Sequence, residues 1–183
     1  MRYVAFLRAI NVGGHTVRME ALRRHFESFG ATNVETFIAS GNVIFDTTRR
    51  NSAALERAIE DHLETALGFP VGTFLRTLPE LAAVAAHAPF PESEFIKSAT
   101  MYVGFLKKEP DKASRAVVAT LCNPVDDLIV HNREFFWLRR NHVGESLLTP
   151  ARFGQAKLGD ATVRNVTTVR KLAARYCQDA GRR

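Results

Sequence analysis

The sequence predicts an α+β protein made of two ferredoxin-like subdomains (α/β plaits) that are related by internal duplication. The first 76 residues alternate strand and helix patterns in the order β-α-β-β-α-β, which is the order of one such unit. A stretch of that unit recurs 99 residues later and is followed by similar elements. The apolar fraction of 46% and the charged fraction of 24% are those of a globular protein, which excludes a largely disordered chain.

The first element is a strand over residues 2–8, a short run rich in β-branched and aromatic residues. A helix follows, because apolar residues recur on one helical face and Gly30 is placed to end it. The residues on that face are Met19, Leu22, Phe26 and Phe29. Strands over residues 34–38 and 43–45 then form a hairpin around a tight turn at Ser40-Gly41-Asn42.

The second half of the first subdomain is a helix from Leu55 to Leu67, which Gly68 closes, and a strand over residues 71–75. A third helix begins near Thr77, because Thr77 and Glu80 have the spacing of a capping box. Two prolines then interrupt the helical pattern, at residues 89 and 91. We therefore expect a connection between the subdomains over residues 77–98.

The recurring stretch is Tyr3-Val4-Ala5-Phe6-Leu7-Arg8, which returns as Tyr102-Val103-Gly104-Phe105-Leu106-Lys107. A helical stretch over residues 111–121 comes next, and then two strands around Asn132-Arg133. The sequence thus predicts a first subdomain over residues 1–76, a helix and linker over 77–98, and a second subdomain over 99–183 that ends in a basic helix.

Positive charge is concentrated at the end of the chain. Residues 133–183 carry 11 Lys and Arg against 4 Asp and Glu, whereas residues 1–132 carry 14 against 15. This imbalance favours an anionic partner, although a solvated face of a basic helix has the same composition. No apolar run of 18 residues exists, so neither a membrane span nor a secretory signal is expected. Two cysteines form no disulfide framework, and the sequence favours a cytoplasmic setting.

Three motifs supply the candidate ligand-binding residues. They are Arg8, Asn11, Gly13 and Gly14 in and before the first loop, Ser40 and Asn42 in the hairpin turn, and Arg164 and Asn165 near the C-terminus. A glycine-rich loop before a helix lets backbone N–H groups converge on an anion, and an arginine binds carboxylate or phosphate as a fork. Each motif also has a structural interpretation: a loop with positive φ, a hairpin turn, and an N-cap that fixes the last helix.

Aromatic residues precede a cationic run in the second subdomain. Phe135-Phe136-Trp137 is followed by Arg139-Arg140-Asn141-His142, and aromatic rings beside cations are what single-stranded nucleic acid requires. Strand alternation places Phe135 and Trp137 on one face and Phe136 on the other, so packing in the core is the alternative. The six histidines lack the spacing of a metal site, and no metal or cofactor is predicted.

Three segments resemble one known family. Residues 7–14 read Leu-Arg-Ala-Ile-Asn-Val-Gly-Gly, residues 40–45 read Ser-Gly-Asn-Val-Ile-Phe, and residues 162–172 begin Thr-Val-Arg-Asn. They are similar to the domain-of-unknown-function family 1697, a group of small bacterial proteins in which glycine is usual where Ala9 stands and tryptophan is common where Val166 stands. The resemblance implies two α/β-plait subdomains and no established activity.

These observations favour a binding module for an anionic small molecule that is phosphorylated or carboxylated. Two alternatives stay open. One is a small enzyme on such a metabolite, with Arg8 and Arg164 as electrostatic stabilisers and His15 as the acid or base; the other is a nucleic-acid-binding protein. If the motifs share one site, Arg164 and Asn165 lie close to the loop over residues 11–14.

Overall fold

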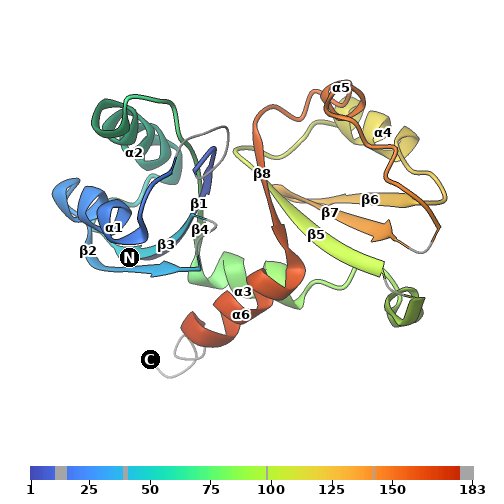
Figure 1. The fold of residues 1–183 in the computed structure, drawn as a ribbon, viewed down its shortest axis with the longest axis horizontal. Helices are drawn as coiled ribbons and strands as arrows, with labels where there is room; N and C mark the ends of the chain where they lie inside the picture. The colour runs from blue at the N-terminus through green and yellow to red at the C-terminus, as the bar shows by residue number, and fades with distance from the viewer. Residues whose placement is uncertain (11–15, 39–40, 98, 142, 178–183) are drawn as a thin grey trace. The chain divides into compact units, whose positions relative to one another are not determined.

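Two four-stranded antiparallel sheets make up the protein, as the α+β class predicts (Figure 1). The structure is a computed structural model that describes residues 1–10, 16–38, 41–97, 99–141 and 143–177, and six α-helices lie within these residues. The chain divides into two compact units, Met1–Ala83 with Leu172–Arg183 and Val84–Lys171. Two helices cross this division, α3 (Leu78–Ala86) and α6 (Val166–Tyr176).

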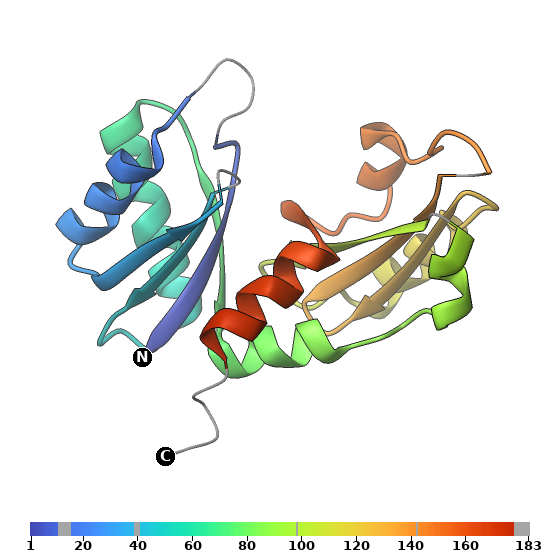
Figure 2. The same cartoon turned by 60° about the horizontal axis from the view of Figure 1, so that its bottom comes forward.

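The first unit contains a sheet with the strand order β2-β3-β1-β4. Its elements are β1 (Arg2–Arg8), α1 (Met19–Ser28), β2 (Thr32–Phe37), β3 (Asn42–Asp46), α2 (Ser52–Leu67) and β4 (Gly72–Thr77). Helices α1 and α2 cover one face of the sheet (Figures 1 and 2). The six predicted elements are thus all present, with ends that differ from the expected ones by a few residues.

The core of the first unit lies between this sheet and the two helices. Tyr3, Ala5 and Leu7 alternate along β1 and are buried against Leu22 and Phe26 of α1 and other apolar residues. Gly68 ends α2 in the left-handed conformation, with φ of 79°, which explains why glycine is needed at that position.

Glutamate side chains accept hydrogen bonds from the backbone N–H groups at the outer edge of β4. An edge strand leaves every second backbone N–H without a strand partner, and such edges invite pairing with other chains. Here three of these N–H groups donate to carboxylates: Thr73 to Glu60 at 2.7 Å, Leu75 to Glu56 at 2.8 Å and Thr77 to Glu80 at 2.8 Å. The last pair is also the predicted capping box, since the N–H of Glu80 returns a bond to the Thr77 hydroxyl at 3.4 Å.

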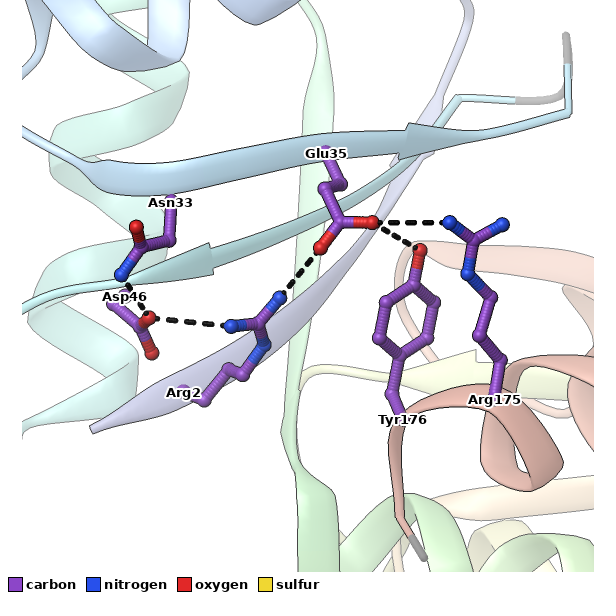
Figure 3. Close-up of polar contacts among 6 residues, drawn as sticks. All are labelled: Arg2, Asn33, Glu35, Asp46, Arg175 and Tyr176. Carbon is purple, nitrogen blue, oxygen red and sulfur yellow. Dashed lines mark hydrogen bonds and ion pairs between the residues drawn. The ribbon is translucent and has the colours of Figure 1, made fainter. Parts of the chain in front are cut away.

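The C-terminal turn of α6 belongs to the first unit because it is bonded to β2 (Figure 3). The Glu35 carboxylate accepts hydrogen bonds from Arg2 at 2.8 Å, from the Tyr176 hydroxyl at 3.0 Å and from Arg175 at 3.2 Å. The sequence predicts that this turn belongs to the second subdomain, over residues 99–183. The contacts with Glu35, 140 residues away in sequence, explain the difference.

The second unit contains a sheet with the order β6-β7-β5-β8. Its elements are the 3-10 helix η1 (Glu92–Lys97), β5 (Ala99–Leu106), α4 (Lys112–Thr120), β6 (Asp126–His131), β7 (Glu134–Arg140), α5 (Pro150–Gly154) and β8 (Ala161–Asn165). Residues of α4 and α5 pack on one face of this sheet, which we call the helix-covered face. The predicted strand, helix and hairpin are confirmed, whereas α5 and β8 have no counterpart among the expectations.

Candidate functional site

Two of the predicted site residues in the first unit have described positions. Arg8 is exposed at the end of β1, opposite Gly72 of β4. Asn42 is fully buried, and its side-chain amide donates to the Phe37 carbonyl at 3.0 Å, which closes the hairpin between β2 and β3. Asn11, Gly13, Gly14 and Ser40, together with His15, lie outside the described residues.

Arg164 and Asn165 point to opposite faces of β8, because side chains alternate along a strand. Arg164 is 8% exposed and donates to the Thr162 hydroxyl at 2.8 Å and to the Val163 carbonyl at 2.9 Å. Burial lowers the pKa of Arg164 to about 10. Asn165 accepts a hydrogen bond from the Thr167 N–H at 2.8 Å, so the predicted cap at the start of α6 is confirmed. The predicted closeness to residues 11–14 falls on residues outside the described ranges.

Aromatic rings line the helix-covered face of the second sheet. Phe135 and Trp137 of β7 lie on this face and Phe136 on the opposite one, as alternation predicts. Trp137 is paired with Tyr102 of β5, with ring centroids 5.0 Å apart. Tyr102 is paired in turn with Asn165 of β8, so Asn165 lies on the same face.

The two consecutive arginines at the end of β7 have different surroundings. Arg140 lies on the face opposite Trp137, where it donates to Glu94 at 2.6 Å and to Asp127 at 3.2 Å. Arg139 lies on the face of Trp137, two residues further along β7. Its Nε is buried without a hydrogen-bond partner. Its cross-strand neighbours are Thr100 of β5 and Asp126 of β6. The Asp126 carboxylate accepts hydrogen bonds from other groups and forms no ion pair with Arg139 among the described residues. Arg140 is therefore held in two ion pairs, whereas Arg139 has the Asp126 carboxylate as a cross-strand neighbour but forms no ion pair with a described residue.

A buried carboxylate, Asp126 of β6, fixes the position of Trp137. It accepts hydrogen bonds from the Trp137 indole at 2.9 Å, the Ser146 hydroxyl at 2.8 Å and the Leu147 N–H at 2.9 Å. Burial alone raises the pKa of Asp126, but these bonds and one from Asn123 outweigh it and hold that pKa below its ordinary value. The next residue, Asp127, faces the opposite side and bonds Arg140, so the two carboxylates form no dyad.

An apolar pocket of about 200 Å³ lies beside Trp137 on the helix-covered face. Its lining residues are Phe135, Trp137, Leu148, Thr149, Phe153 and Val163. Sequence reasoning missed this pocket, because three of its walls come from residues 148–153, for which no element is predicted. The alternation of aromatic residues along β7 was the one signal that pointed toward it.

Within the described ranges, no three His, Cys, Asp or Glu side chains come together in a way that could hold a metal ion. None of the helices in the described part of the chain is both long and apolar enough to cross a membrane.

Comparisons with known proteins agree with this architecture. A solved structure, that of the conserved bacterial protein SP0830 from Streptococcus pneumoniae, is similar with a TM-score of 0.72 and 22% sequence identity, over 97% of this chain and 98% of that chain. At this identity the likeness shows the fold alone. No curated protein matches the sequence. The model of one family matches residues 1–136, a span that holds the first two resembling segments and leaves out residues 162–172. The chain therefore belongs to the family described as protein of unknown function (DUF1697).

Proposed function

We propose that the protein binds a small anionic molecule, phosphorylated or carboxylated, on the helix-covered face of the second unit. The observation that carries the proposal is Arg139, whose buried Nε has no hydrogen-bond partner and whose guanidinium has no ion-pair partner among the described residues. A partly buried cation is costly unless an anion or acceptor neutralises it. Arg140 is already held by Glu94 and Asp127, so Arg139 is the guanidinium of this strand end that has no ion pair with a described residue, with Asp126 as its cross-strand neighbour.

The chemistry of the Arg139 guanidinium suits an anionic ligand. A guanidinium recognises carboxylate and phosphate through paired N–H donors. Thr100 of β5 and Asp126 of β6 are the cross-strand neighbours of Arg139, and Tyr102 and Asn165 lie further along the same face. The site does not include Arg164, which faces the opposite side of β8. Arg8, the glycine-rich loop of the first unit and Arg164 stay predicted anion-binding residues by their chemistry. The proposal is one of binding; His15, the predicted acid or base of the enzyme alternative, lies outside the described residues.

Titration with inorganic phosphate and with acetate tests the proposal, with calorimetry as the readout. We expect Arg139→Gln to weaken binding at least about ten-fold, because a charge-assisted hydrogen bond contributes about 1.5–3 kcal/mol. Arg170→Gln is the matched control, since it removes the same charge from an exposed position of α6. Binding that is unchanged in Arg139→Gln, or absent for both anions, overturns the proposal.

A single-stranded oligonucleotide in the same titration distinguishes a nucleic-acid role. Stacking on Trp137 and Tyr102 with Arg139 as the phosphate contact is the chemistry such a role would use. If the oligonucleotide binds far more tightly than phosphate and its affinity falls steeply with salt, the small-molecule proposal is replaced by nucleic-acid binding.

We further propose that each unit is ferredoxin-like and that the two arose by duplication. The strand orders β2-β3-β1-β4 and β6-β7-β5-β8 are the same when β5 is equated with β1. The equated strands also carry equivalent pairs: Tyr3 stacks on Phe45 at 6.0 Å where Tyr102 meets Trp137 at 5.0 Å. Ala5 opposite Val43 in the first unit corresponds to Gly104 opposite Phe135 in the second. The second unit thus has the smaller residue on β5 and the larger one on β7.

We place this binding in the cytoplasm. Support comes from Cys122 and Cys177, which are free and half-buried. Burial raises the pKa of both thiols, so both stay protonated at neutral pH. Thiol labelling of the denatured protein, freshly isolated without reductant, should find two free thiols, and a disulfide or oxidised cysteine there would contradict this placement.

A further inference from the structure

The pocket beside Trp137 has the size and lining of a site for one aromatic ring. Its volume is about 200 Å³, and the rings of Phe135, Trp137 and Phe153 form three of its walls. A closed apolar cavity of about 150 Å³ in another protein takes up benzene. Aromatic walls also favour a planar guest, because rings attract one another in offset and edge-to-face arrangements.

The walls of this pocket are held in place by hydrogen bonds made elsewhere. Asp126 anchors the Trp137 indole and the N–H of Leu147, the residue before the wall residue Leu148. Thr149 accepts a bond from the Arg152 N–H at 3.2 Å and so begins the short helix that carries Phe153. Phe153 in turn lies 4.9 Å from Phe135 between ring centroids. A pocket with such fixed walls loses little conformational entropy when a ligand enters.

A cation stands next to this apolar site. Arg139 follows Trp137 on the same face of β7, and alternate residues of a strand are about 6–7 Å apart. This spacing is that of the two Cα atoms, and Arg139 is not itself a lining residue, so a group outside the pocket has to extend past Trp137 to reach the guanidinium. A negative charge on that part of the ligand is what the guanidinium favours.

We propose that the ligand is a planar aromatic ring carrying an anionic group, with the ring in the pocket and the acid on Arg139. This inference rests on the proposed function, which requires only the anion. Carboxylate and phosphate are the shared chemistry that a guanidinium accepts, and benzoate and phenyl phosphate are the probes for the two.

The single tryptophan of the chain is a wall of the pocket, so intrinsic fluorescence reports binding directly. We expect benzoate or phenyl phosphate to change the Trp137 emission and to bind at least about ten-fold more tightly than acetate or inorganic phosphate, because ring burial adds apolar transfer. Benzyl alcohol, a neutral ring, should bind more weakly than benzoate.

A pocket-filling variant supplies the structural control. Val163→Phe puts a ring into the pocket from β8 and should abolish the advantage of benzoate over acetate. Ile129→Phe makes a similar change at a position equally exposed, 38% against 39% for Val163, on the opposite face of the sheet, and should leave it intact.

The outcomes separate this inference from the proposed function. If acetate and phosphate bind through Arg139 but the aromatic acids bind no more tightly, the ring site is wrong and the anion site stands. If benzyl alcohol binds as tightly as benzoate and Arg139→Gln changes neither affinity, the anion site is wrong, and so is the proposal of an aromatic acid. If Val163→Phe leaves the benzoate advantage intact, the ring is not bound in this pocket.

Discussion

A single methyl group added at Gly104 should destabilise the second unit. Gly104 lies in β5 opposite Phe135, and a Cβ built on it would overlap the ring carbons Cε1, Cζ and Cε2 of Phe135. Phe135 is 1% exposed and packs against Phe153, so its ring yields only by moving toward the neighbouring pocket. Overpacking of this kind costs about 1–3 kcal/mol. We expect Gly104→Ala to fall in the upper half of that range, because a buried ring is displaced rather than the end of a flexible side chain.

Urea unfolding followed by Trp137 fluorescence measures this loss in the unit where it arises. With a slope of about 1–3 kcal/mol per molar urea, the midpoint should fall by about 1 M. Gly154→Ala is the matched control, since a Cβ there meets nothing within 4 Å and the residue is the last of helix α5. Its midpoint should stay the same or rise, because alanine favours helix over glycine by up to about 1 kcal/mol.

A second substitution should restore part of the lost stability. Phe135→Val alone removes buried apolar atoms and should cost about 3 kcal/mol or less. In Gly104→Ala/Phe135→Val the clash is gone, and the pair becomes the one that Ala5 and Val43 form in the first unit. We expect the double variant to be more stable than the sum of the single effects by at least about 1 kcal/mol. Additive effects, or a Gly104→Ala midpoint equal to that of the unmodified protein, would refute the steric argument.

Three further predictions concern titratable groups. Asp126→Asn should destabilise the second unit by about 1.5–3 kcal/mol. Folding lowers the pKa of Asp126, so its contribution to the free energy of unfolding is full above the unfolded pKa of about 3.9 and is lost as the pH falls through the lowered value. The free energy of unfolding in urea should therefore fall less steeply at acid pH in the variant than in the unmodified protein. His131→Gln should raise the pKa of His87 in an NMR titration, since burial and then the stacked His131 ring 4.1 Å away lower it; an unchanged His87 would contradict this. Glu35→Gln should lower the pKa of Tyr176, which burial and then Glu35 raise, and ultraviolet titration should find one tyrosine shifted relative to a Glu64→Gln control.

The elements that the sequence predicts are those that are specified by the local spacing of apolar residues and by helix-capping residues. The helix ended by Gly68 and the capping box of Thr77 and Glu80 are examples, and both are confirmed. Strand β8 and helix α5 are five residues each, too short for a period to show. β8 is a strand because it pairs with β5, about 60 residues earlier, and no local pattern carries that information. The last turn of α6 likewise joins the first unit through Glu35, a contact between distant residues.

The candidate site shows the same limit in one pair of neighbours. Sequence alternation establishes that Arg139 and Arg140 face opposite sides of β7, and it places Trp137 with Arg139. It does not tell which arginine is neutralised, because Glu94 reaches Arg140 from a 3-10 helix 46 residues away. That long-range ion pair removes Arg140 from the candidates and leaves Arg139 beside the aromatic wall. A ligand site on this strand thus follows from alternation together with a tertiary contact, and Glu94→Gln should leave anion binding at Arg139 unchanged while Arg139→Gln weakens it. Equal losses in the two variants would mean that the arginines act as one cationic patch, and the assignment to Arg139 would be wrong.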